Sequence, residues 1–122
     1  MTQEQQLPRE RRLVSASDLR RIIESGRRRK LGNLDVYWTD NSAGHPRMGL
    51  IVPRFQSTAV ARNRLRRRLR EIWRRELQST AGAVDVVVRA RRSAYGLSFD
   101  QLRSEFSTWT GKPGRAGAAE RE

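Results

Sequence analysis

Cysteine is absent from the chain, and histidine and lysine are almost absent. Without cysteine the protein has no disulfides, no thiolate zinc sites and no cysteine nucleophile. The one histidine, His45, stands beside Pro46 in a segment that is dense in turn-forming residues. A histidine in such a loop is far more often structural or solvated than catalytic. These absences exclude several kinds of protein-based active site.

Long apolar runs and clustered acidic residues are also missing. No run reaches the roughly 18 apolar residues of a membrane-spanning helix, and the N-terminus lacks an apolar stretch of signal-peptide type. The acidic residues are scattered, and there is no glycine-rich phosphate loop, metal-ligand spacing or nucleophile with a partner base. Paired acid–base catalysis and a metal-dependent nuclease site are therefore not indicated. We expect no catalytic residue, no protein-bound metal, no membrane partner and a cytoplasmic location.

Arginine is what the chain has in excess. Lysine and arginine together number 26 against 13 acidic residues, which gives a formal net charge of +13. The guanidinium group is a planar fork of donors that matches phosphate and stacks on bases. Such an excess in 122 residues indicates a nucleic-acid partner. A merely basic, soluble protein is the weaker interpretation.

The chain is expected to form one domain, at 12–109, between polar tails at 1–11 and 110–122. Hydrophobic periodicity, capping residues and turn residues predict its elements. They are a helix capped by Ser17 and ended by Gly26, strands at 34–39 and 48–52, a helix at about 59–78 capped by Ser57 or Thr58, a strand at 84–90, and a helix capped by Ser98 with Phe99, Leu102, Phe106 and Trp109 inward.

The order of these elements predicts an α+β or α/β sandwich with one layer of sheet. The close spacing of 34–39 and 48–52 suggests that they form an antiparallel pair, and the helix that follows implies a parallel pair somewhere in the sheet. The nearly continuous valines of 84–90 suggest a central strand that is buried on both sides. The cationic run Arg27–Lys30 fits a solvated loop and a phosphate contact equally well.

The helix at 59–78 separates apolar from cationic residues. On a helical wheel its apolar stripe, which is expected to face the core, consists of Ala61, Leu65, Leu69, Ile72 and Trp73. The residues to one side of this stripe, here called the cationic flank, are Asn63, Arg66, Arg67, Arg70 and Arg74. Arg62 lies at the edge of the stripe, and the opposite flank is mixed because it includes Glu71.

The cationic flank favours binding to a polyanion. An ordinary solvated helix face alternates charges of opposite sign, whereas arginines gathered without acids repel one another. Asn63 could hydrogen-bond a base edge, a ribose or a phosphate, or it could cap an early turn of the helix. A membrane surface also attracts basic amphipathic helices. It is disfavoured here because the apolar stripe is needed to close the core.

Two aromatic residues of the first predicted strand are candidates for base stacking. Tyr37 and Trp38 are adjacent, so their side chains point to opposite faces of a sheet. An exposed aromatic beside a basic helix suits stacking on unpaired bases, but both rings could equally belong to the core. Phe55, in the loop before the arginine-rich helix, is a second candidate.

At this point the chain resembles the protein subunit of bacterial ribonuclease P. The resemblance rests on a strand Arg47-Met48-Gly49-Leu50-Ile51-Val52, a short loop, and the helix Ala59-Val60-Ala61-Arg62-Asn63-Arg64-Leu65-Arg66-Arg67-Arg68-Leu69-Arg70-Glu71. It extends more weakly over about 12–109. The arginine-asparagine pair in this helix is its most specific part.

The resemblance implies a fold and an activity. The fold would be a single-domain α–β sandwich whose small central sheet contains a left-handed βαβ crossover, like the second domain of ribosomal protein S5; general handedness rules would give a right-handed one. The protein would join a catalytic RNA, which uses Mg²⁺, and help it remove the 5′ leader of precursor tRNA. We expect a monomer in a 1:1 complex with that RNA.

The resemblance, taken together with the residue pattern, gives two sets of site residues. Those expected to bind RNA are Arg54, Arg62, Asn63, Arg64, Arg66, Arg67, Arg70 and Arg74. Those expected to line a cleft for the single-stranded leader are Leu19, Ile23, Tyr37, Ile51 and Phe55. The family commonly has phenylalanine where Leu19 and Ile23 stand, and a basic residue where Phe55 stands.

Two other classes of function compete with this interpretation. A small ribosomal or DNA-binding protein would share the composition, but a helix-turn-helix protein needs a helix where 48–52 looks extended. A stand-alone nuclease would need clustered carboxylates, which the sequence lacks.

Overall fold

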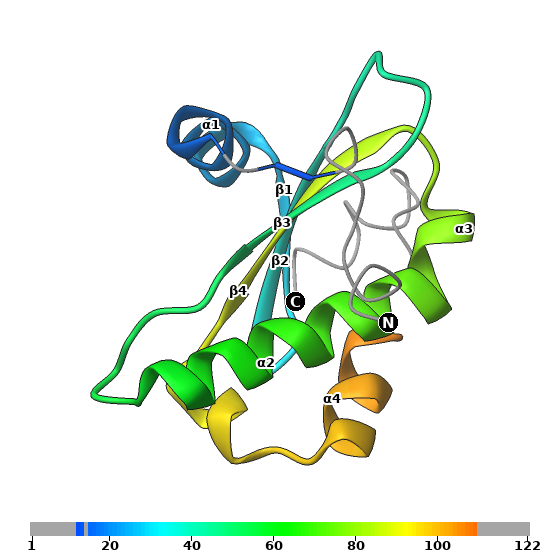
Figure 1. The fold of residues 1–122 in the computed structure, drawn as a ribbon. Helices are drawn as coiled ribbons and strands as arrows, with labels where there is room; N and C mark the ends of the chain where they lie inside the picture. Colours follow the sequence, from blue (N-terminus) through cyan, green and yellow to red (C-terminus); the bar gives the residue numbers. More distant parts are fainter. Residues whose placement is uncertain (1–11, 14, 110–122) are drawn as a thin grey trace.

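A four-stranded sheet carries one helix on one face and the remaining helices on the other (Figure 1). The computed structural model describes residues 12, 13 and 15–109; the two predicted tails lie outside this range. The described elements are α1 (Ala16–Ser25), β1 (Arg27–Lys30), β2 (Leu34–Asp40), β3 (Arg47–Ile51), α2 (Ala59–Ile72), the π-helical turn η3 (Trp73–Leu77), α3 (Gln78–Ala81), β4 (Val84–Ala90), the 3-10 turn η4 (Arg92–Gly96) and α4 (Phe99–Phe106). The predicted α+β class is confirmed.

Strand β4 occupies the interior of the sheet, as its valines predict. The strand order is β1-β2-β4-β3, and β4 pairs antiparallel with β2 and parallel with β3. The predicted direct pairing of 34–39 with 48–52 is therefore wrong. Strand β4 separates them because its residues 84–88 are all buried and need neighbours on both edges. The α2 crossover between β3 and β4 supplies the expected parallel pair.

Strand β1 is an element that the sequence did not predict. Residues Arg27–Lys30 pair antiparallel with β2, and Arg27 stands opposite Trp38. The guanidinium carbon of Arg27 lies 5.8 Å from the centroid of the Trp38 ring, and Arg29 donates a hydrogen bond to the Thr108 carbonyl at 2.8 Å. The loop interpretation of this run is thus wrong. Cationic side chains suit an edge strand because they oppose pairing with other chains.

Most predicted helix ends agree with the structure. Thr58 caps α2 by accepting from the Ala61 amide at 3.0 Å, and Ser98 caps α4. For α1 the cap is Ser15 rather than Ser17, since the Ser15 hydroxyl accepts from the amide of Asp18 at 3.4 Å. Two serines stand two positions apart there, and local pattern did not distinguish them.

Gly26 ends α1 as predicted. Its amide donates to the Ile22 carbonyl at 2.8 Å. A Cβ at this position would lie 2.6 Å from the Ile22 oxygen and 2.7 Å from the Trp38 oxygen. Only glycine allows α1 to approach β2 so closely.

The two faces of the sheet bury different cores. The main core lies between the sheet and the α2–α4 layer, where Leu65, Leu69, Ile72 and Trp73 of the predicted stripe are buried; Ala61 is half-buried. A smaller cluster under α1 consists of Leu13, Ile22, Tyr37 and Val87, with Leu19, Ile23 and Ile51 packed against it. The alternation of side chains along β2 and β4 produces this division.

Candidate nucleic-acid interface

Part of the cationic flank of α2 is neutralised by a carboxylate of the protein itself. Arg67 and Asn63 are exposed, and Arg66 donates to the Asn63 side-chain oxygen at 3.2 Å. Arg74 instead binds the Glu71 carboxylate, at 2.9 and 3.0 Å. The prediction of a purely cationic flank is therefore wrong at its C-terminal end. Glu71 reaches Arg74 because side chains three positions apart on a helix are neighbours.

Arg12 joins the cationic flank from outside the helix. It forms a parallel bridge with Met48, and the Leu13 amide donates to the Met48 carbonyl at 3.1 Å. The pKa of Arg70 is lowered, first by burial and then by the positive charges of Arg66 and Arg12. Arg70 still carries its charge at neutral pH. An anion bound between these three groups would relieve their repulsion.

Sequence reasoning missed Arg12. The residue falls at the boundary of the predicted tail, and no local pattern relates it to Arg70, which lies far along the chain in α2. Only the pairing of the segment with β3 brings it within electrostatic reach of Arg70.

The other predicted RNA-binding arginines lie around the beginning of α2. Arg54 and Arg64 are exposed, and Arg62 is half-buried. The Nε of Arg62 is buried without a hydrogen-bond partner among the described residues. Arg68, which was not a predicted site residue, donates to the Leu97 carbonyl at 3.3 Å and so helps to hold η4 against the helix.

Four of the five predicted cleft residues lie together beside α1. Leu19, Ile23 and Ile51 are half-buried around Tyr37, and we call these four residues the α1 patch. Only 4% of Tyr37 is exposed, so the idea of an open stacking ring on β2 is wrong. Trp38 is buried on the opposite face, so both rings belong to the core. Tyr37 is covered because α1 crosses the sheet directly over it.

Phe55 does not belong to the α1 patch. Its ring packs instead against Tyr95 of η4, and the two ring centroids are 6.4 Å apart. The prediction had grouped it with the cleft as an aromatic ring in the loop before the arginine-rich helix, where the family commonly has a basic residue. The backbone turns away from the α1 patch at this loop, where Phe55 and Gln56 both have positive φ.

Cations lie beside the α1 patch. Two of them, Arg28 and Lys30, belong to the run that the sequence left open between a solvated loop and a phosphate contact, whereas Arg89 was not singled out. The strand register places Arg28 opposite Tyr37, and Lys30 and Arg89 opposite Asp35, so all three share the face that carries α1. They are exposed, and the Arg89 guanidinium carbon lies 5.8 Å from the centroid of the Tyr37 ring. We call these three residues the rim. Strand β1 had been taken for a loop, so its alternation of faces was not considered.

Asp35 and Arg91 form an ion pair beside the rim. The Arg91 guanidinium donates to the buried Asp35 carboxylate at 3.1 and 3.2 Å. The hydrogen bonds and the charge of Asp35 raise the pKa of Arg91. The pair satisfies a buried acid within a cationic surface.

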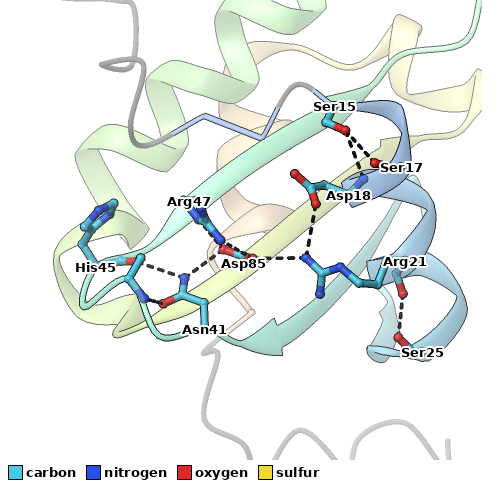
Figure 2. Close-up of polar contacts among 10 residues, drawn as sticks. Ser15, Ser17, Asp18, Arg21, Ser25, Asn41, His45, Arg47 and Asp85 are labelled. Atoms are coloured by element: carbon cyan, nitrogen blue, oxygen red, sulfur yellow. Dashed lines mark hydrogen bonds and ion pairs between the residues drawn. The ribbon is translucent and has the colours of Figure 1, made fainter.

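A second buried carboxylate, Asp85, connects α1 to the sheet (Figure 2). Only 1% of Asp85 is exposed. It accepts from Arg47 at 2.8 and 2.9 Å and from the Asn41 amide at 2.8 Å, and Arg21 of α1 lies 3.7 Å away. The hydrogen bond to Asp85 raises the pKa of Arg47. One acid thus orients β3, the loop after β2, and α1.

No described part of the chain suggests a metal site or a membrane span. Within residues 12, 13 and 15–109, no group of three or more histidine, aspartate or glutamate side chains is arranged to hold a metal ion. No helix in the same range is both long and apolar enough to cross a membrane.

The fold and its surfaces define a class of protein. A small α+β domain carries unneutralised arginines on α2 and a cation-rimmed apolar patch on the opposite face of its sheet, which is the arrangement of an RNA-binding protein. The chain belongs to the ribonuclease P family, because the model of that family, described as Ribonuclease P, matches residues 7–114.

Known relatives agree with this assignment. The ribonuclease P protein component of Pseudarthrobacter chlorophenolicus is 34% identical over 88% of this chain and 85% of its own length. That of Acidothermus cellulolyticus is 36% identical over 87% of this chain and 90% of its own. Among solved structures, the RNase P protein of Staphylococcus aureus matches with a TM-score of 0.75 and 27% identity, over 80% of this chain and 90% of that one.

Membership confirms the resemblance and the general activity. Proteins of this family are the protein subunit of an endoribonuclease that processes the leader of precursor tRNA, with catalysis by its RNA. The competing interpretations, a ribosomal or DNA-binding protein and a stand-alone nuclease, receive no support from these relatives.

The Asp85 network predicts a difference between two carboxylates. Asp85→Ala leaves Arg47 and Asn41, which are both half-buried, without this acceptor, so we expect a loss of about 2–3 kcal/mol in the free energy of unfolding. Asp40→Ala is the control, since Asp40 is well exposed and its ion-pair partner among the described residues is Arg27, and it should cost less than about 1 kcal/mol. Urea denaturation measures both. Equal losses would show that Asp85 has no special structural role.

Proposed function

We propose that this chain binds the ribonuclease P catalytic RNA through α2 and the 5′ leader of precursor tRNA through the α1 patch. The supporting observation is the separation of the two surfaces. The α1 patch and the cationic side of α2 belong to opposite layers of the sheet, and β3 forms the edge between them. One rigid domain can therefore contact two RNA segments at once.

The α2 surface suits a structured RNA. Arg66 and Arg12 act on Arg70, and an RNA backbone would neutralise their mutual repulsion, while Arg67 lies exposed on the same helix. The exposed Arg54 and Arg64 extend this surface around the start of the helix. Asn63 is held by Arg66 and keeps its amide NH₂ group for a ribose, a phosphate or a base edge.

The α1 patch suits an unpaired strand. Leu19, Ile23 and Ile51 offer aliphatic contact, and the buried Tyr37 supports them from below. The rim cations can contact the phosphates of a strand that crosses the patch. Binding of this kind depends on shape and charge rather than on base identity, which suits leaders of differing sequence.

Chemistry in this proposal belongs to the RNA. The described acids do not form a metal site, so Mg²⁺ would be held by the catalytic RNA and its substrate. The protein contributes positive charge where two polyanions meet. We further propose a 1:1 complex of protein and catalytic RNA, located in the cytoplasm.

Reconstitution tests the proposal directly. Mixed with a cognate catalytic RNA at low Mg²⁺, the protein should promote cleavage of precursor tRNA at the end of its leader. The protein without RNA should leave the precursor intact. Cleavage by purified protein after nuclease treatment has removed all catalytic RNA would refute the assignment of catalysis to the RNA.

Arg67→Ala should reduce the salt dependence of binding to the catalytic RNA. Loss of one phosphate contact lowers the slope of log affinity against log salt concentration by roughly 1. Arg75→Ala is the matched control, because Arg75 lies on η3, which continues α2, but pairs with Glu71. A titration between low and physiological salt measures the slopes. Identical slopes for both variants would place the RNA elsewhere.

Arg89→Ala should weaken leader binding selectively. Arg89 belongs to the rim, and its loss removes about one phosphate contact from a strand on the α1 patch. We expect affinity of the reconstituted complex to fall several-fold for precursor tRNA and to stay unchanged for mature tRNA. Arg75→Ala again serves as the control. An equal loss for both RNAs would remove the leader from this face.

A further inference from the structure

Phe55 is held outward at the beginning of α2. Its exposed fraction is 36%, and Val60, at 68%, is the other large apolar side chain that stands exposed in the described part of the chain. Phe55 and the next residue, Gln56, have φ values of +48° and +64°. Residues with side chains seldom adopt this left-handed conformation, since it costs free energy. Such strain persists only where surrounding contacts impose it.

One hydrogen bond within the loop and contacts with the distant η4 hold this backbone conformation. The Ser57 amide donates to the Arg54 carbonyl at 2.7 Å and closes the turn. The Tyr95 hydroxyl of η4 donates to the Pro53 carbonyl at 2.6 Å, and the Tyr95 ring stands edge-on to Phe55 at 88°. The aromatic ring is therefore fixed in place rather than free to fold back onto the core.

A cation accompanies the exposed ring. The guanidinium carbon of Arg92 lies 5.3 Å from the centroid of the Phe55 ring, within the range of a cation–π contact. No carboxylate of the described residues forms an ion pair with Arg92, and Arg54, which precedes Phe55 in the chain, is exposed. An aromatic face next to an uncompensated guanidinium offers the two contacts that one nucleotide requires, namely base stacking and a phosphate partner.

We propose that Phe55 and Arg92 form a stacking site for one unpaired nucleotide of RNA, separate from the α1 patch. The ring stacks on the base, Arg92 contacts the adjoining phosphate, and Tyr95 positions the ring. A protein partner fits this surface less well, because a single ring among arginine and glutamine side chains is too small an apolar area for docking. The inference rests on the proposed function, since it assumes an RNA partner.

Two RNA strands of the holoenzyme could supply this base. It belongs either to the leader of the precursor or to a single-stranded part of the catalytic RNA, and the chemistry at Phe55 is the same. Because η4 and the start of α2 lie away from α1 (Figure 1), a base bound here is a different one from any on the α1 patch.

The test couples a side-chain deletion to a base deletion. Precursor tRNAs that each carry one abasic nucleotide at a successive leader position are titrated with the reconstituted complex. If the leader supplies the base, one abasic position weakens binding to the wild type by roughly tenfold. Phe55→Ala should weaken binding to the intact leader by the same factor and show no further loss at that position.

The second arm measures affinity for the catalytic RNA alone. If that RNA supplies the base, Phe55→Ala lowers this affinity roughly tenfold and no leader position couples to it. Phe55→Tyr should retain binding in both arms because it keeps an aromatic face, whereas Arg92→Ala should weaken it. Val60→Ala is the control, since it removes exposed apolar surface without a ring.

The stacking site would be overturned if the Phe55→Ala variant bound both precursor tRNA and the catalytic RNA as tightly as the wild type does. That outcome is distinct from failure of the proposed function, which would appear as an absence of leader cleavage by the wild-type complex. A Phe55→Ala complex that cleaves normally and binds both RNAs normally would leave the proposed function standing and remove this inference alone.

Discussion

A single buried carboxylate orients much of the α1 side of this protein. Asp85 is almost completely inaccessible, and a charge in that position is tolerated only when donors surround it. Its hydrogen-bond donors come from β3 and from the loop after β2, and Arg21 of α1 adds an ion pair at 3.7 Å. This acid therefore adds a polar tie to the apolar cluster of Leu13, Ile22, Tyr37 and Val87 that packs α1 on the sheet, and the α1 patch depends on where α1 lies.

The arginines of this chain fall into two groups with different roles. Arg47, Arg74 and Arg91 are paired with acids and hold the protein together. Others, such as Arg67 on α2 and Arg89 on the rim, lie exposed on the two faces proposed to meet RNA. Net charge alone does not distinguish these groups, since a paired arginine and an exposed one count equally. The distinction decides which substitutions affect stability and which affect RNA binding.

The family assignment accounts for the lack of a catalytic constellation. In an enzyme whose RNA carries out the chemistry, the protein needs surfaces of the correct charge and shape rather than a nucleophile or a metal site. The two-sided sheet provides such surfaces on opposite layers. The strained loop at Phe55, fixed by η4, adds a third feature whose geometry suits a nucleotide.

Local features of this fold could be predicted from sequence because they depend on neighbours along the chain. Helical periodicity predicted the buried stripe of α2, and continuous valines predicted the central place of β4. Capping chemistry predicted Ser98 and restricted the cap of α2 to Ser57 or Thr58. The arginine-asparagine motif indicated the family, which the comparisons confirm.

Long-range pairing lay beyond such reasoning. The insertion of β4 between β2 and β3, the pairing of β1, the burial of Tyr37 and the approach of Arg12 to Arg70 all join segments far apart in the chain. So does the contact of Tyr95 with the loop of Phe55. Periodicity specifies which side of an element is apolar, but which elements become neighbours depends on how all the buried surfaces are satisfied together.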